Sequence, residues 1–179
     1  MADYTALRDN LLYVLKESQM KIGYTENAAS INYPPASLCR LLGAELNDDE
    51  LKRELSGFCD SVLPILGDVA VSKYDGQYCL TVPAQGVRYV HEQVEESPFL
   101  AELIELVRDH RAKDIGDVLA VFRKYSDKVV VREADSDEYN YVLHFEDGDP
   151  DGFVYLVEAM FGHVSYHRMT MPDYLAEIK

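Results

Sequence analysis

One segment of the chain has the carboxylate spacing of a calcium-binding loop. Asp147, Asp149 and Asp151 occupy alternate positions, Gly152 follows, and Glu158 stands at position 12 of the pattern. In an EF-hand these positions supply oxygen ligands, and the glycine allows a sharp turn. The four acidic residues are therefore candidate ligands for a calcium ion.

The flanks of this segment favour a different interpretation. An EF-hand requires a helix on each side of its loop, whereas residues 139–146 and 153–160 are rich in the aromatic and branched side chains typical of strands. Pro150 also lies inside the loop. The alternative is a solvated acidic loop that joins two antiparallel strands.

Metal or catalytic chemistry elsewhere has less support in the sequence. His144, His163 and His167 lie near two glutamates, but on a strand the last two would be about 13 Å apart, at ~3.3 Å per residue. Zinc ligands must lie ~2 Å from one ion. The chain also lacks G-x-S-x-G, P-loop and G-x-G-x-x-G motifs, so no catalytic residue or cofactor is expected.

The segment from residue 34 to residue 94 has the element order of a winged helix. The pattern predicts a short helix over 36–42, a second helix that begins at a capping box of Asn47 and Glu50, a hairpin, and a helix from Pro83 to about Val94. Asp75-Gly76 is a type I′ turn pair, and a two-residue turn sets Val71 opposite Leu80. An additional helix over residues 3–19 precedes this segment; five residues give it an apolar face: Leu7, Leu11, Val14, Leu15 and Ile22.

The second helix of this segment has the wrong charge for reading DNA. Residues 47–61 contain five acids and only two bases, Lys52 and Arg53. Phosphate contacts require lysine and arginine. We therefore expect a protein-facing surface, with these candidate interaction residues on the helix and in the hairpin: Asp48, Asp49, Lys52, Arg53 and Lys73.

The remaining sequence predicts a second α+β unit. Residues 95–97 are the expected boundary, which gives a winged-helix-like unit over 1–96 and a second unit over 97–179. Two helices are expected after the boundary, one from Pro98 to about His110 and one capped by Asp114. Strand patterns follow over 128–133, 139–146, 153–160 and 163–169, and Thr170 with Asp173 frames a short C-terminal helix.

Composition restricts the classes of function. The chain is globular in composition (47% hydrophobic) and carries a net charge of −15, spread over both halves, which disfavours nucleic acid and anionic lipid as partners. There is no pattern of a signal peptide and no apolar run near the roughly 20 residues that span a bilayer. Three cysteines without a CxxC pair are typical of a reducing compartment, so a cytoplasmic protein without membrane contact is expected.

Several strings, taken in order, resemble a small bacterial family known only as a domain of unknown function. They lie at residues 21–24, 33–38, 86–91, 125–129 and 166–174. The resemblance covers nearly the whole chain. It implies one architecture and a bacterial cytoplasmic setting, and it assigns no activity or catalytic residue.

Two classes of function follow from the residues. The preferred class is a non-catalytic protein–protein interaction or regulatory module that binds a protein partner or forms a homodimer. The alternative is a winged-helix DNA-binding regulator that uses Arg40, Lys73 and Arg88 for its contacts. The calcium or metal binder described above is a third possibility.

Overall fold

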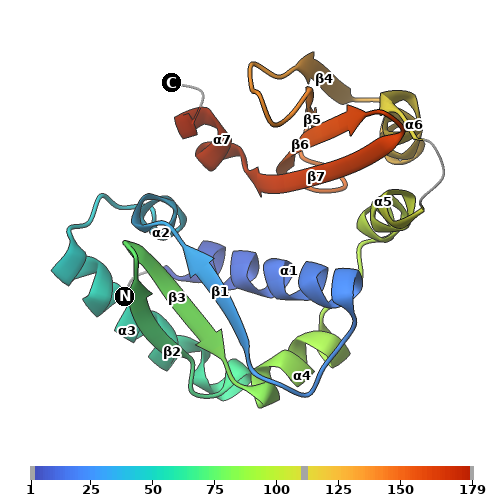
Figure 1. The fold of residues 1–179 in the computed structure, drawn as a ribbon. Helices are drawn as coiled ribbons and strands as arrows, with labels where there is room; N and C mark the ends of the chain where they lie inside the picture. Colours follow the sequence, from blue (N-terminus) through green and yellow to red (C-terminus); the bar gives the residue numbers. More distant parts are fainter. Residues whose placement is uncertain (1–2, 110–112, 178–179) are drawn as a thin grey trace. The chain divides into compact units, whose positions relative to one another are not determined.

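The computed structural model of the chain describes residues 3–109 and 113–177. It consists of two compact units, Met1–Glu96 and Ser97–Lys179, here called the N-terminal and the C-terminal unit. Each unit combines helices with an antiparallel sheet (Figure 1), so the predicted α+β class is confirmed.

The N-terminal unit alternates helices with the strands of one small sheet. In chain order its elements are α1 (Thr5–Ile22), β1 (Ala29–Tyr33), α2 (Pro35–Leu42), α3 (Asp48–Leu66), β2 (Ala70–Tyr74), β3 (Gln77–Val82) and α4 (Ala84–Gln93). The strand order is β1-β3-β2, so β1 pairs with the second strand of the later hairpin.

The hairpin of β2 and β3 has the predicted register. Asp75 and Gly76 both have positive φ values, 47° and 77°, as a type I′ turn requires. Val71 lies opposite Leu80, as predicted, but Leu80 is buried whereas Val71 is 37% exposed. The difference arises because β3 is the central strand and β2 an edge strand whose residues are all exposed.

The helices of this unit bury one face each against a common core. Leu7, Leu11 and Leu15 of α1 are buried as predicted, but Ile22, the last residue of the helix, is 80% exposed. Pro64 lies inside α3, which runs to Leu66 and is followed by Gly67 at its C-terminus. A proline in the last turn removes only one backbone hydrogen bond, and burial of Leu66 offsets that loss.

A glycine allows α4 to approach the end of α3 closely. A Cβ atom at Gly86 would overlap the carbonyl oxygen of Leu66 and the Cγ1 atom of Val82. The glycine is therefore required by the packing of these elements.

The C-terminal unit contains two helices, a four-stranded meander and a last short helix within its described residues. These elements are α5 (Pro98–Arg108), α6 (Ile115–Tyr125), β4 (Val129–Glu133), β5 (Tyr141–Phe145), β6 (Phe153–Met160), β7 (His163–Thr170) and α7 (Met171–Glu177). The strand order β4-β5-β6-β7 follows the chain. All four predicted strands are present, and the predicted helix end at His110 lies outside the described residues.

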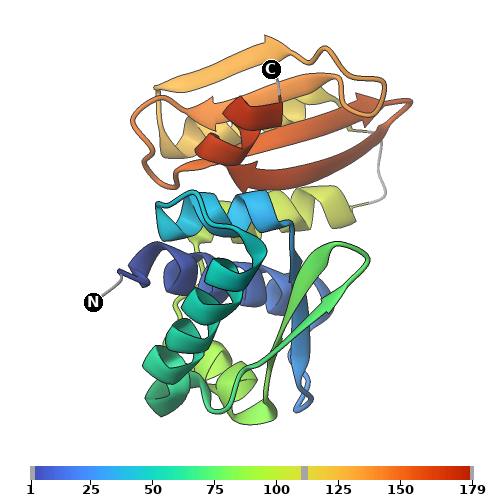
Figure 2. The same ribbon diagram turned by 90° about the vertical axis from the view of Figure 1, so that its left-hand side faces the viewer.

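An aromatic cluster joins α5 and α6 to one face of this sheet. Phe99 makes edge-to-face contacts with four rings, at centroid distances of 4.8 to 5.7 Å, and these rings are Phe122, Tyr125, Phe145 and Tyr155. Figure 2 shows α7 over the sheet on one side and α6 on the opposite side. The two faces of the sheet are therefore covered by different helices.

Candidate functional site

The first turn of α3 is fixed by a capping box. The side-chain oxygen of Asn47 accepts hydrogen bonds from the backbone N–H groups of Asp49 and Glu50, each at 3.1 Å, and the Glu50 carboxylate accepts from the Asn47 N–H at 2.9 Å. The predicted box is thus confirmed. It places Asp48 and Asp49 at the helix N-terminus, where the helix dipole favours negative charge.

Asp48 connects α3 to both strands of the hairpin. Its Oδ2 atom pairs with Lys52 Nζ at 2.8 Å, one turn along the helix. Its Oδ1 atom accepts hydrogen bonds from Lys73 Nζ on β2 and from the Tyr78 hydroxyl on β3, the latter at 2.6 Å. These four residues are called the Asp48 cluster.

The charges of the Asp48 cluster are balanced once Asp49 is included. Hydrogen bonds from Lys52, Lys73 and Tyr78 hold the pKa of the Asp48 carboxyl well below its usual range. The same carboxylate raises the pKa of Lys52. Burial, and then the bond to Asp48, raises the pKa of Tyr78 to about 12. The cluster therefore combines one carboxylate with two lysines, and Asp49 adds a second carboxylate 3.9 Å from Lys52.

A groove of about 470 Å³ runs between α3 and β2 beside this cluster. Lys52 and Lys73 line it together with Asp60, Asp68 and several smaller side chains. The groove therefore combines two lysines that pair with Asp48 with two further carboxylates, those of Asp60 and Asp68. It is called the α3–β2 groove.

The structure brings most of the predicted interaction residues together. Asp48, Lys52 and Lys73 are in direct contact, and Asp49 adjoins them with a side chain that is 92% exposed. Arg53 is exposed on α3 and does not line the groove. The sequence prediction missed Tyr78, although the two-residue turn places it opposite Lys73.

The three cations that a DNA-binding interpretation would use already have partners. Lys73 donates to Asp48. A hydrogen bond to Tyr24 and the charge of Glu26 raise the pKa of Arg88. Arg40 donates to the Ser37 hydroxyl oxygen at 3.4 Å.

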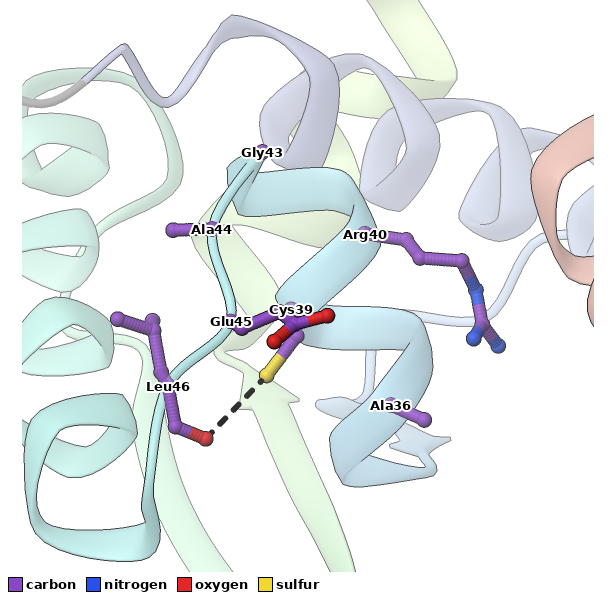
Figure 3. A pocket seen from close by; sticks show the side chains of 7 residues that line it. All are labelled: Ala36, Cys39, Arg40, Gly43, Ala44, Glu45 and Leu46. Atoms are coloured by element: carbon purple, nitrogen blue, oxygen red, sulfur yellow. Dashed lines mark hydrogen bonds between the residues drawn. The ribbon is translucent and has the colours of Figure 1, made fainter.

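Arg40 also lines a shallow hollow of about 480 Å³ beside α2 (Figure 3). The Cys39 thiol in this hollow donates to the Leu46 carbonyl oxygen at 3.7 Å, and the Arg40 side chain extends away from it. The thiol therefore stabilises the turn between α2 and α3.

The acidic segment of the calcium pattern joins β5 to β6, so strands flank it on both sides. Asp147 pairs with Lys128 at 2.9 Å and also accepts the Asp149 N–H at 3.3 Å. Asp151 accepts the Tyr155 hydroxyl at 2.6 Å, and Glu158 within β6 accepts the Ser165 hydroxyl at 3.2 Å. Over residues 3–109 and 113–177, no three His, Cys, Asp or Glu side chains are grouped so that they could hold a metal ion.

A family model matches residues 4–178 of the chain, with the description "Domain of unknown function, E. rectale Gene description (DUF3877)". The chain belongs to the DUF3877 family. The match extends over both units, so the DUF3877 domain includes the N-terminal and the C-terminal unit. No curated protein and no solved structure matches the chain.

Membership of DUF3877 confirms the resemblance but assigns no activity. Within the part of this DUF3877 chain that the structure describes, no helix has both the length and the hydropathy needed to cross a membrane. Its function must therefore be inferred from the geometry of the site.

Proposed function

We propose that this DUF3877 chain is a non-catalytic protein–protein interaction or regulatory module, and that its N-terminal unit is a winged-helix-like scaffold. The order of α2, α3 and the β2–β3 hairpin supports the scaffold, as does the pairing of β1 with β3. On this scaffold α3 and the hairpin form the recognition surface.

The bond between Lys73 and Asp48 is the observation that carries this proposal. Lys73 is the only basic residue between residues 68 and 83, which include the whole hairpin. In a winged helix that binds DNA, the hairpin directs such a cation toward a phosphate group. Here the lysine donates to a carboxylate of α3 instead, together with Lys52.

The surface around the Lys73–Asp48 bond is acidic. Residues 47–75 contain seven acids and three bases. Next to Lys73, the ring of Tyr74 is 84% exposed near the tip of the hairpin. Exposed tyrosines are enriched among the residues that dominate protein–protein contacts. An acidic surface with an exposed aromatic ring suits a basic protein surface, on another protein or on a second copy of this chain.

A cytoplasmic location is part of the same proposal. Cys39, Cys59 and Cys79 are free thiols in the structure. Free thiols are the usual state in a reducing compartment, which supports this location.

Affinity capture with a charge-reversal variant tests the proposal. The immobilised full chain is compared with Asp49→Lys, beside the Asp48 cluster, and with Glu95→Lys, which makes the same charge change at an exposed position after α4. A bound protein, or a second copy seen by analytical ultracentrifugation, should be lost only with Asp49→Lys. Equal binding by all three chains would contradict a recognition role for this surface.

Binding to DNA is the competing outcome. Fluorescence anisotropy with a labelled 30-base-pair duplex in ~50 mM salt should show no saturable binding. Binding that falls steeply as salt rises is the mark of phosphate contacts, and would refute the proposal in favour of a DNA-binding regulator.

A further inference from the structure

A cavity of about 600 Å³ lies in the C-terminal unit, on the face of the sheet that α7 covers. Val142 and Leu156, which are neighbours across β5 and β6, form its apolar lining from the sheet. Tyr139 from the β4–β5 connection and Tyr174 from α7 add two aromatic rings. A volume of this size is within the range of roughly 300–1,000 Å³ that small-molecule sites occupy. It is called the tyrosine–carboxylate cavity.

Four carboxylates complete the lining, and no lysine, arginine or histidine does so among the described residues. They belong to Glu133, Asp135, Glu138 and Glu177. All four residues are exposed at the rim, and none of them forms an ion pair with another residue of the described ranges. The lining of the cavity therefore has a formal charge of −4, which the described residues lining it do not compensate.

Tyr139 lies beside these carboxylates. Burial raises the pKa of the Tyr139 phenol, and the charges of Glu138, Glu158 and Glu177 add to the effect. The face of its ring is stacked with His167, with centroids 6.4 Å apart. Arg132 is adjacent to Val142 across β4 and β5, but it is exposed and does not line the cavity.

The spacing of the carboxylates decides which cation suits the cavity. No three acidic or histidine side chains among the described residues are close enough to hold one metal ion. A small inorganic ion could therefore satisfy only part of the charge. An extended cation can reach separate carboxylates and place its methylene groups against Val142 and Leu156. One of its ammonium groups can also lie over the ring of Tyr174, because a ring face attracts cations.

We propose that the tyrosine–carboxylate cavity binds a multiply protonated aliphatic amine, of the polyamine class. A monovalent amine would leave three of the four carboxylates uncompensated, and a purely aromatic cation would not use the apolar lining of the sheet. This inference lies in the other unit and does not depend on the proposed function of the N-terminal unit.

Calorimetric titration of the full chain with spermidine in ~50 mM salt tests the proposal. One saturable site is expected. The double variant Glu133→Gln/Glu138→Gln should weaken binding about fivefold to tenfold, since each exposed charge contributes a modest factor. Tyr174→Leu should weaken it about threefold through the loss of the ring face.

A matched control comes from the same connection. Asp137 is an exposed acid between Ser136 and Glu138 that does not line the cavity, so Asp137→Asn should leave the affinity unchanged. If Asp137→Asn weakened spermidine binding as much as the double variant does, the binding would reflect general counterion attraction, and the proposal would be overturned. Absence of saturable heat would overturn it as well. Tighter binding of a tri-lysine peptide than of spermidine would reject a free amine as the ligand.

Discussion

Phe99 should be the largest single contributor to the core of the C-terminal unit. It is fully buried and contacts four rings edge to face. In Phe99→Leu all four contacts are lost. Edge-to-face pairs contribute about 0.5 kcal/mol each at the low end of their range, or about 2 kcal/mol for four. The smaller leucine side chain also fills the buried site less well, which costs about 1 kcal/mol. The free energy of unfolding should therefore fall by about 3 kcal/mol.

The assay is urea unfolding followed by near-ultraviolet circular dichroism, to which the chain contributes thirteen tyrosines and no tryptophan. Phe161→Leu is the matched control, because the Phe161 side chain is 99% exposed. Its unfolding free energy should change by no more than about 0.5 kcal/mol. If Phe99→Leu lowered the stability by less than about 1 kcal/mol, or by no more than the control, the ring cluster would not be the centre of this core.

Three further outcomes are expected. Because the pKa of Asp48 is lowered in the folded state, its contribution to stability is complete above its ordinary value of 3.8 and is lost as pH falls below it. The stability difference between wild type and Asp48→Asn, measured by urea unfolding, should therefore be largest near pH 6 and shrink below pH 4. Gly86→Ala should lower the unfolding free energy by roughly 1–3 kcal/mol in the same assay, because its Cβ meets backbone. Gly152→Ala, which meets nothing within 4 Å, should change it by less than about 0.5 kcal/mol. Calorimetric titration with calcium should give no saturable heat, because strands flank Asp147–Asp151; a stoichiometric heat that Glu158→Gln abolishes would restore the calcium interpretation.

Local sequence signals predicted the elements of this fold well. The capping box at Asn47, the cap at Asp114 and the Asp75-Gly76 turn are all present, because each depends on residues at most three positions apart. Helix ends were less predictable. The first helix was expected over residues 3–19, but α1 runs to Ile22, since helix ends fray and are not marked by the apolar pattern.

Contacts between distant segments were the part that the sequence did not reveal. Asp48 and Lys52 were recognised as candidate interaction residues because both lie on the second helix that the sequence predicts. The bond from Tyr78 to Asp48 joins residues 30 positions apart and depends on where the hairpin packs against α3. Phe99 was missed for a similar reason, because its four ring partners come from three other elements. A helical period identifies an apolar face but not its partners.

The dependence of two lysines on one carboxylate has a consequence for how this surface could diverge. Exchange of Asp48 for a neutral residue would remove one negative charge and, at the same time, release the Lys52 and Lys73 ammonium groups from their shared acceptor. A single codon change would then turn the meeting point of helix and hairpin from charge-balanced to cationic. DUF3877 members that lack an acid at this position are accordingly where a switch of partner, from polypeptide to polyanion, should first be sought.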